Sequence, residues 1–302
     1  MQDTFSHRTV LLNEAVDALS VQPDGHYIDA TFGRGGHSRL ILSGLSPLGR
    51  LTVFDKDPQA IAAANALADV DERISVRHEG FKHLGELEAA SADGVLMDLG
   101  VSSMQLDVAD RGFSYAQEAE LDMRMDQTRG KTAADLLATM DEAELARIFR
   151  RYGEERFAGP IARRIVRERQ VSPITTSTQL NKIVLDVVPV VPGKTNGHPA
   201  KRIYQALRIA VNDELGVLED AMPQAIDALA VGGRLVVMSY HSLEDGIVKD
   251  ALQAAATSST PVDMPVELPG TAPVLKIITR GVERATELEL EKNPRSASAR
   301  LR

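Results

Sequence analysis

The chain of 302 residues contains no cysteine, and this absence excludes several kinds of chemistry. Without thiols there are no disulfides, no thiolate metal ligands and no cysteine nucleophile, so stability must come from packing. The sequence also lacks any run near the ~18 apolar residues of a membrane span, and its first residues contain no apolar signal-peptide core. We therefore expect a soluble cytoplasmic protein that does not insert into membranes.

An excess of positive charge is absent too, since the formal net charge is −9. This value argues against indiscriminate binding to nucleic acid through a global positive field, although it is compatible with a local basic surface. The hydrophobic content of 43% suits a globular protein with a core, and the length allows one large domain or two modest ones.

The segment 27–38 is the most informative part of the sequence. A short apolar strand ends there in an acid and leads into a turn with three glycines, whose backbone can adopt positive φ and approach a ligand where a helix begins. The next strand, 50–55, ends in Asp55, about 20 residues further on, where nucleotide-binding βαβ units place an acid for the ribose hydroxyls. A tight turn without a ligand is the alternative, but the acid favours a nucleotide-like cofactor.

The first hundred residues alternate between expected strands and helices, which predicts an α/β fold with a mostly parallel sheet covered by helices. Asp57 and Pro58 suit the N-cap and the first position of one of these helices. Ligands in such folds bind beyond the carboxyl ends of the strands, where the glycine turn, Asp55, Phe81 and Asp98 fall. The expected strands cover 27–30, 51–54, 74–78 and 94–98, and the expected helices cover 36–43 and 58–68.

A helical block interrupts this pattern. Periodic apolar residues predict a helix that Asp141 caps and that ends at Gly153, and further helices follow it. The α/β pattern resumes with a glycine turn at 232–233 and a buried strand at 234–239, and a last strand is expected at 274–279. We therefore expect a discontinuous α/β domain made of 1–107 and 201–302, with a helical insertion at 108–200.

Three classes of nucleotide compete for the carboxyl edge of the sheet. Residues 193–195 imitate the end of a phosphate-binding P-loop, but Val188 stands where its earlier glycine must be, which excludes that class. Nicotinamide binding would require G-x-G-x-x-G, and the spacing of the glycine turn differs from it.

S-adenosylmethionine has no phosphates. It needs a close backbone approach for its amino-acid part, an acid for the ribose, an apolar contact for adenine and a polar strand end near the sulfonium. Residues that could supply these in that order are Gly35 to His37, Asp55, Phe81 and Asp98. A nicotinamide oxidoreductase and a non-catalytic adaptor protein stay open as alternatives.

A set of motifs runs in order from near the N-terminus to the last ten residues, at 9–16, 29–38, 54–58, 96–103, 111–114, 121–126, 152–157, 240–245 and 293–295. Together they resemble the RsmH (MraW) family of small-subunit ribosomal RNA cytosine-N4 methyltransferases. The resemblance implies a Rossmann-like class I methyltransferase fold, with helices on both faces of the sheet and an inserted helical domain that recognises RNA. It also implies S-adenosyl-L-methionine as methyl donor and the N4 amine of a cytosine in the decoding centre of 16S rRNA as acceptor.

The resemblance further implies the site residues and the partner. Its motifs place the cofactor contacts at Gly35, Gly36, His37, Asp55, Phe81, Asp98 and Gln105. The expected partner is 16S rRNA within the small ribosomal subunit, and a homodimer is compatible with the sequence. Two features depart from the family pattern: Tyr240 stands where we expect Phe in many members, and the stretch 251–273 is short.

The catalytic candidates are Asp98 and His241. We expect Asp98 mainly to hold the cofactor and secondarily to polarise the acceptor amine, whose lone pair is delocalised into the cytosine ring. His241 suits a general base because the pKa of an unperturbed imidazole is near ~6.5, but a histidine in a strand-to-helix turn more often bonds the backbone. We expect no metal site.

The substrate-binding candidates are Phe113, Tyr240, Arg163 and Arg164. A cytosine that leaves its stack needs an aromatic platform, which Phe113 or Tyr240 could provide, although either ring could equally be core. Arg163 and Arg164 belong to an arginine-rich helical block that could contact RNA phosphates, and the alternative is a solvated helix face paired with nearby glutamates.

Overall fold

The structure is a computed structural model that describes residues 8–189, 197–261, 263–264, 266 and 268–302. The segment with residues 193–195 therefore lies outside the described residues. The chain divides into two compact units, an α/β unit made of 1–100 and 215–302 and a helical unit made of 101–214.

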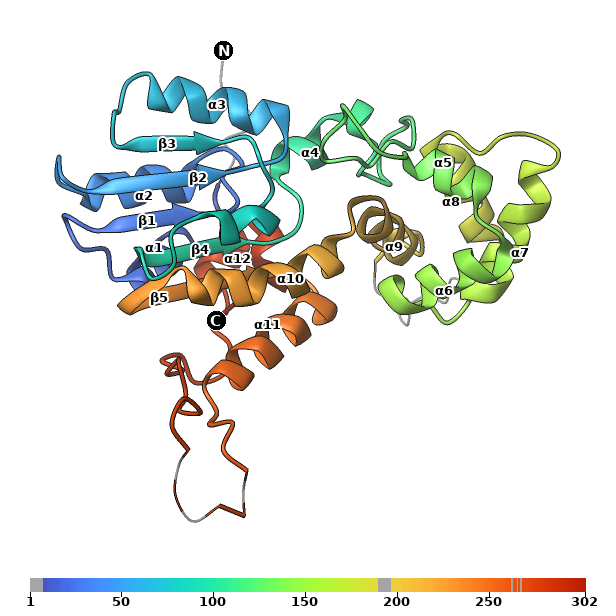
Figure 1. The fold of residues 1–302 in the computed structure, drawn as a ribbon. Helices are drawn as coiled ribbons and strands as arrows, with labels where there is room; N and C mark the ends of the chain where they lie inside the picture. The colour runs from blue at the N-terminus through green and yellow to red at the C-terminus, as the bar shows by residue number, and fades with distance from the viewer. Residues whose placement is uncertain (1–7, 190–196, 262, 265, 267) are drawn as a thin grey trace. The chain divides into compact units, whose positions relative to one another are not determined.

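The α/β unit is built on a six-stranded sheet with the strand order β3-β2-β1-β4-β5-β6 (Figure 1). The pairs from β3 to β5 are parallel, and β6 alone runs antiparallel to its neighbour. The strands are β1 (His26–Asp29), β2 (Arg50–Phe54), β3 (Ile74–Arg77), β4 (Ala92–Asp98), β5 (Leu229–Ser239) and β6 (Arg300–Leu301). This topology confirms the predicted α/β class, because the central strands are buried and their carboxyl ends share one edge.

Helices cover both faces of this sheet. One face packs against η1 (Phe81–Glu86), α10 (Glu214–Asp227) and α11 (Ser242–Ala255), which contribute the side chains of Leu84, Met222 and Val248 to a shared core. The helices α1 (Leu12–Leu19) and α2 (Gly36–Gly44) lie on the opposite face (Figure 1). The remaining elements of the unit are α3 (Pro58–Ala68), α12 (Glu287–Lys292) and η3 (Pro294–Ser298).

The predicted helix at 58–68 matches α3, and local chemistry explains where it starts. The Asp57 carboxylate accepts a hydrogen bond from the Gln59 N–H over 2.9 Å, and Pro58 occupies the first turn. A side-chain cap of this kind satisfies an N–H group that the helix cannot pair internally, so the start of the helix is fixed by sequence.

Two sequence predictions about the last strands were wrong. The glycines at 232–233 do not form a turn before the strand, because β5 already begins at Leu229 and the pairing with β4 shifts register between Ala92 and Gly94. The segment 274–279 is not a strand. Its start is bonded instead to the end of α11, through the N–H groups of Val274 and Leu275 and the Ala255 carbonyl. The edge of β5 is taken by β6.

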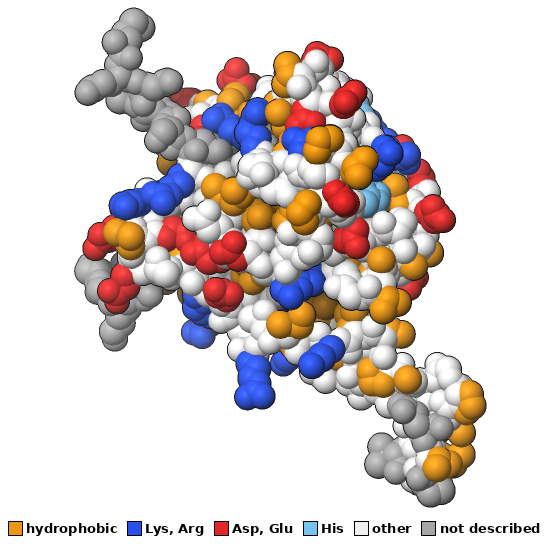
Figure 2. All heavy atoms as spheres, turned by 90° about the vertical axis from the view of Figure 1, so that its left-hand side faces the viewer, with side chains coloured by type: hydrophobic (Ala, Val, Ile, Leu, Met, Phe, Trp, Pro, Cys, Tyr) orange, Lys and Arg blue, Asp and Glu red, His pale blue; other side chains and the backbone are white. Residues whose placement is uncertain are grey.

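The loop that follows α11 carries exposed apolar side chains, and Figure 2 shows apolar side chains on this projecting loop. Exposed members include Met264, Val266, Val274 and Ile278. Among the helices that the structure describes, none combines the length and the apolar character needed to cross a bilayer.

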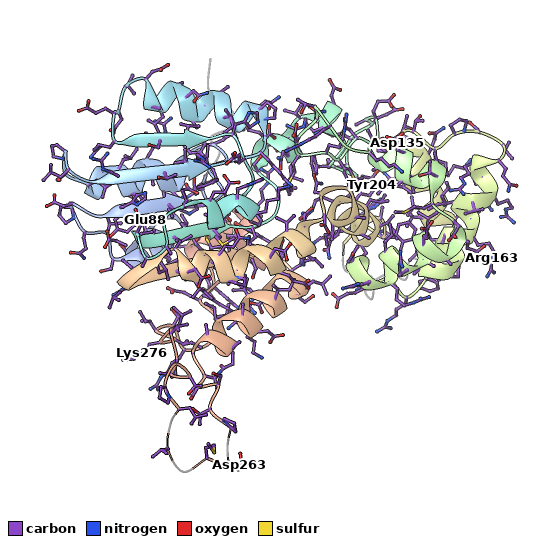
Figure 3. All side chains as sticks on the ribbon, in the orientation of Figure 1. Glu88, Asp135, Arg163, Tyr204, Asp263 and Lys276 are labelled. Carbon is purple, nitrogen blue, oxygen red and sulfur yellow. The ribbon has the colours of Figure 1, made fainter. Side chains whose placement is uncertain are left out.

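The helical unit packs around its own core. Its elements are α4 (Ser103–Asp107), η2 (Ala109–Arg111), α5 (Ala133–Thr139), α6 (Glu142–Gly153), α7 (Ala158–Arg169), α8 (Ser177–Val187) and α9 (Lys201–Asn212). As predicted, Asp141 caps α6 and the last residue of that helix is Gly153; the cap is a capping box that Asp141 forms with Glu144. Tyr204 lies among these helices (Figure 3).

The observed division differs from the predicted boundaries of 108–200 for the helical insertion. Helix α9 belongs to the helical unit, because Ile203, Tyr204 and Leu207 are buried in that unit's core. The segment 101–107 belongs to it as well, and Val101 and Leu106 pack against the same core.

Candidate active site

The glycine turn joins β1 to α2 at the carboxyl edge of the sheet. Gly35 adopts a φ of +75° as the N-cap of α2, a conformation that side chains with a Cβ rarely adopt. A Cβ on Gly35 would lie 2.6 Å from the Phe32 ring, and a Cβ on Gly36 would collide with Oγ1 of Thr9. The two glycines therefore leave space for the side chains of Phe32 and Thr9. The spacing of the glycines in the sequence did not reveal this role.

Asp55, which follows β2, ties this turn to the neighbouring strand. Its carboxylate accepts hydrogen bonds from the Gly33 N–H over 2.8 Å and from the Asp57 N–H over 2.9 Å. Burial raises the pKa of Asp55, while the two backbone hydrogen bonds oppose that rise. The predicted ribose acid and the glycine turn are thus in direct contact.

Asp98, at the end of β4, lies at the centre of a second group of polar side chains. Its Oδ1 accepts a hydrogen bond from the Tyr240 hydroxyl over 2.7 Å, and its Oδ2 lies 3.9 Å from His37 Nδ1. Its own N–H donates to Thr31 Oγ1 over 2.6 Å. Burial raises the pKa of Asp98 to about 7, with the Glu244 charge adding to the rise and the Tyr240 hydrogen bond opposing it.

His37 is buried between the turn and the N-terminal segment. Its Nε2 lies 3.2 Å from the Val10 carbonyl oxygen, an acceptor, so Nε2 carries a proton. Burial lowers the pKa of His37, and the charge of Asp29 opposes that change. A neutral ring with its proton on Nε2 presents an unprotonated Nδ1 on the side of Asp98.

Asp29, the acid that ends β1, was not among the predicted site residues. It is 1% exposed and accepts hydrogen bonds from the Ser38 hydroxyl over 2.6 Å and the Thr31 N–H over 3.1 Å. Burial raises its pKa. The sequence signal was available, because Asp29 ends the first strand directly before the glycine turn.

His241 caps helix α11, as the backbone-bonding interpretation expected. Its Nδ1 accepts from the Glu244 N–H over 3.4 Å, and Glu244 Oε2 accepts from the Tyr240 N–H over 2.8 Å and the His241 N–H over 3.3 Å. Glu244 is 2% exposed and its Oε1 lies 3.1 Å from His241 Nε2. Sequence reasoning missed this buried glutamate, although its place three residues after the cap is typical of a capping box. A role of His241 as a base stays a prediction.

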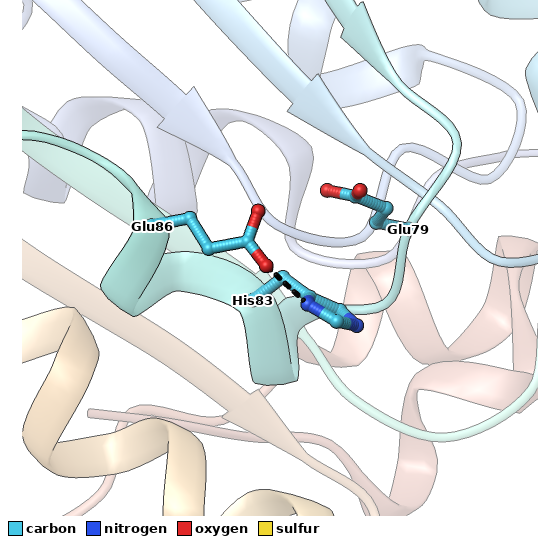
Figure 4. Close-up of side chains that lie close together, drawn as sticks. All are labelled: Glu79, His83 and Glu86. Atoms are coloured by element: carbon cyan, nitrogen blue, oxygen red, sulfur yellow. Dashed lines mark hydrogen bonds and ion pairs between the residues drawn. The ribbon is translucent and has the colours of Figure 1, made fainter.

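Phe81 begins η1, where its ring is partly buried against the core of the α/β unit. Beside it, Glu79, His83 and Glu86 form the small group drawn in Figure 4, in which His83 Nδ1 lies 2.7 Å from Glu86 Oε1. Arg77 pairs with Glu79 over 3.1 Å and with Glu86 over 2.8 Å. A single guanidinium therefore pairs with both carboxylates.

A strap of N-terminal residues, 8–11, covers the glycine turn and is held from the other end of the chain. The Leu11 N–H donates to Glu289 Oε1 over 2.9 Å, and the Asn293 side-chain amide donates to the Arg8 carbonyl over 3.0 Å. The same strap supplies Thr9 against Gly36 and the Val10 carbonyl beside His37. The motif at 293–295 thus contacts the strap that packs on the glycine turn.

The remaining predicted residues lie in the helical unit. Gln105 is buried and its Oε1 accepts from the Ser102 N–H over 3.0 Å, as part of the capping box of α4. Phe113 is only 6% exposed and belongs to the core of that unit, as the alternative interpretation of this ring expected. Their predicted contacts with cofactor and RNA stay predictions.

The two predicted RNA-binding arginines of α7 are ion-paired. Arg163, which points outward in Figure 3, lies 3.3 Å from Glu142. Arg164 lies 2.8 Å from Glu168 and 3.5 Å from Asp186. This arrangement is the solvated, acid-paired face that the sequence left open as the alternative.

Comparison with known proteins identifies the family. Residues 4–302 match the model of the MraW methylase family. The chain belongs to this family of methyltransferases. A ribosomal RNA small subunit methyltransferase H from Beutenbergia cavernae is 52% identical over 304 residues, which cover 98% of this chain and 91% of that protein. The protein of the same name from Chromobacterium violaceum is 52% identical over 306 residues, covering 99% and 94%.

One of the solved structures that resemble this MraW-family chain is more distant in sequence. An rRNA methylase from Streptococcus thermophilus is 14% identical with a TM-score of 0.38, and the alignment covers 89% of this chain and 95% of that one.

Proposed function

We propose that this methyltransferase transfers a methyl group from S-adenosylmethionine to the exocyclic N4 amine of a cytosine in the decoding centre of small-subunit ribosomal RNA, in the cytoplasm. Membership of the MraW family supports the reaction class, and the names of the relatives support ribosomal RNA as substrate. The observation in the structure that carries the proposal is the group of three carboxylates around the glycine turn: Asp29, Asp55 and Asp98.

These carboxylates fit a positively charged cofactor. Burial raises the pKa of all three, which means that each loses solvation as an anion and gains from a nearby positive charge. S-adenosylmethionine carries a sulfonium and an ammonium group against a single carboxylate. A dinucleotide would instead bring the negative charges of a pyrophosphate beside these acids, so the carboxylates disfavour the nicotinamide alternative.

The residues that would hold the cofactor are those that meet at the carboxyl edge of the sheet. Asp55 suits the ribose hydroxyls, because each of its oxygens accepts a single backbone N–H and retains lone-pair capacity. The ring of Phe81 offers an apolar contact for adenine, and the turn at Gly35 offers main-chain groups for the amino-acid part. When bound, the cofactor supplies an electrophilic methyl group.

The chain's own contribution to the chemistry is positioning and proton handling. Donor and acceptor must be held within a near-attack distance of about 3 to 3.5 Å. Asp98 is the stronger acceptor for a hydrogen bond from the acceptor amine when it is a carboxylate, and this bond would draw electron density toward the nitrogen. Its pKa of about 7 allows Oδ2 to take up a proton and release it near neutral pH.

A labelled-methyl assay on small ribosomal subunits that lack the modification tests this proposal. We expect label in a single cytosine at N4, and we expect Asp98→Asn to lower the transfer rate by about 100-fold, within the range that positioned acid-base groups contribute. Calorimetric titrations of the protein with S-adenosylmethionine and with NAD accompany the assay and measure which cofactor binds. Binding of NAD alone would indicate an oxidoreductase, and binding of neither would indicate an adaptor protein.

A further inference from the structure

The arginines of the helical unit differ in what compensates their charge. Arg163 and Arg164 on α7 pair with acids, and Arg169 donates to the Leu137 and Met140 carbonyls over 2.6 Å each. The side chains of Arg147, Arg150 and Arg151 on α6 have neither an ion pair nor a hydrogen bond within the described part of the chain. All three are exposed.

These three arginines share the outer side of one helix. Leu145, Ile148 and Phe149 turn the other side of α6 into the core of the unit. Arg147 and Arg151 are four residues apart, so they are neighbours on the helix surface and repel each other. The negative end of the helix dipole favours Arg150 and Arg151 in the last turn, but it does not reach Arg147 one turn earlier.

A hollow lies between these side chains. Its volume is about 250 Å³, and it is lined by Arg147, Ile148, Arg151 and Tyr152. The Arg151 guanidinium carbon lies 5.6 Å from the centre of the Tyr152 ring, a cation–π contact that orients the arginine. The hollow thus offers, next to an aromatic ring, two guanidinium groups whose donors have no partner among the residues that the structure describes.

We propose that this α6 patch, Arg147, Arg150, Arg151 and Tyr152, binds the RNA substrate, with Arg147 and Arg151 holding one backbone phosphate in the hollow. The inference rests on the proposed function for the class of partner. Guanidinium groups match phosphate oxygens bidentately, and an aromatic ring beside them suits the ribose and base of single-stranded RNA. In a chain with a net charge of −9, such a patch provides attraction that the whole molecule does not.

The test compares two double variants that remove the same charge from neighbouring helices. Arg147→Gln/Arg151→Gln removes the uncompensated pair, and Arg163→Gln/Arg164→Gln removes the acid-paired one. Binding of unmodified small-subunit RNA, transcribed in vitro, is measured for the full-length proteins between 50 and 200 mM salt. Circular dichroism and the affinity for S-adenosylmethionine show whether each variant keeps its fold and its cofactor site.

We expect the α6 variant to bind RNA roughly tenfold more weakly at 50 mM salt. The slope of the logarithm of its association constant against the logarithm of the salt concentration should fall in magnitude by roughly 0.7 for each RNA phosphate that the variant no longer neutralises. The α7 variant should stay within about twofold of wild type. Equal behaviour of the two variants, or an unchanged slope for the α6 variant, would overturn the proposal. The RNA-binding measurement does not depend on methyl transfer. A wild-type protein that binds RNA but transfers no methyl group would therefore contradict the proposed function without contradicting the α6 patch.

Discussion

The Tyr240 hydroxyl donates a hydrogen bond to Asp98 Oδ1 over 2.7 Å, and this contact favours the ionised form of the acid that we propose to contact the acceptor amine. Burial and the nearby Glu244 charge raise the pKa of Asp98 to about 7, while the Tyr240 hydrogen bond lowers it. His37 on α2 and Asp29 at the end of β1 face the same group. Asp98 therefore titrates where a small change in its surroundings alters the ionised fraction at neutral pH.

We expect Tyr240→Phe to move the acidic limb of the pH–rate profile upward. A hydrogen bond worth about 1 kcal/mol corresponds to roughly 0.7 pH units. The wild-type rate should fall as the pH drops through about 7, because protonated Asp98 is a weaker acceptor for the amine and can no longer take up its proton. The variant should lose activity at a higher pH. Rates of methyl transfer between pH 5.5 and 9 decide this, and coincident acidic limbs would show that Asp98 ionisation does not limit transfer.

Asp98→Asn should stabilise the protein at pH 8 while it impairs transfer. The folded-state pKa of Asp98 is raised from 3.8 to about 7, so the ionised form is disfavoured in the folded protein and its stability declines as the pH rises through that window. The free energy of unfolding should fall by at most about 4 kcal/mol over this pH range because of Asp98. Urea unfolding should show the variant more stable at pH 8 and similar to wild type near pH 4. A variant that is less stable at pH 8 would argue against this burial cost.

Gly36→Ala should destabilise the α/β unit by about 1–3 kcal/mol, the usual cost of overpacking. The added Cβ would collide with the Thr9 side chain. The matched control is the double variant Gly36→Ala/Thr9→Gly, in which the opposing side chain is gone and stability should largely return. Denaturant unfolding measures both. If Gly36→Ala alone were neutral, the N-terminal strap would not be packed on the glycine turn.

His241→Asn should leave the shape of the pH–rate profile unchanged, because asparagine is also a good N-cap and the histidine's contacts serve α11. His241→Ala, which cannot cap, should cost about 1 kcal/mol of stability. Thermal unfolding together with the pH–rate profile separates the two roles. If the pH–rate profile of the asparagine variant lost a titration step, His241 would be a catalytic acid or base.

The sequence was sufficient for features that depend on neighbouring residues. Helix α3 follows from Asp57 and Pro58, and the contact between the glycine turn and Asp55 follows from the geometry of parallel strands. The false strand at 274–279 has the apolar content of a strand, but β6 occupies the edge where it would pair.

Features that depend on distant residues could not be predicted from the sequence. The bond from Leu11 to Glu289 joins opposite ends of the chain, and the fit of Thr9 against Gly36 is equally tertiary. Likewise, α6 and α7 are both rich in arginine. Only the structure shows that acids pair with Arg163 and Arg164 on α7.

Calorimetric titration with S-adenosylmethionine near pH 7, repeated in buffers of different ionisation enthalpy, tests the central claim most directly. If the carboxylates at the glycine turn bind the positively charged donor, wild-type protein should release protons on binding, since the donor favours ionised Asp98. Asp98→Asn should release fewer protons, and the product S-adenosylhomocysteine, which lacks the sulfonium charge, should cause less release than the donor. No uptake of the donor at millimolar concentration, or binding without any change in protonation, would contradict the account.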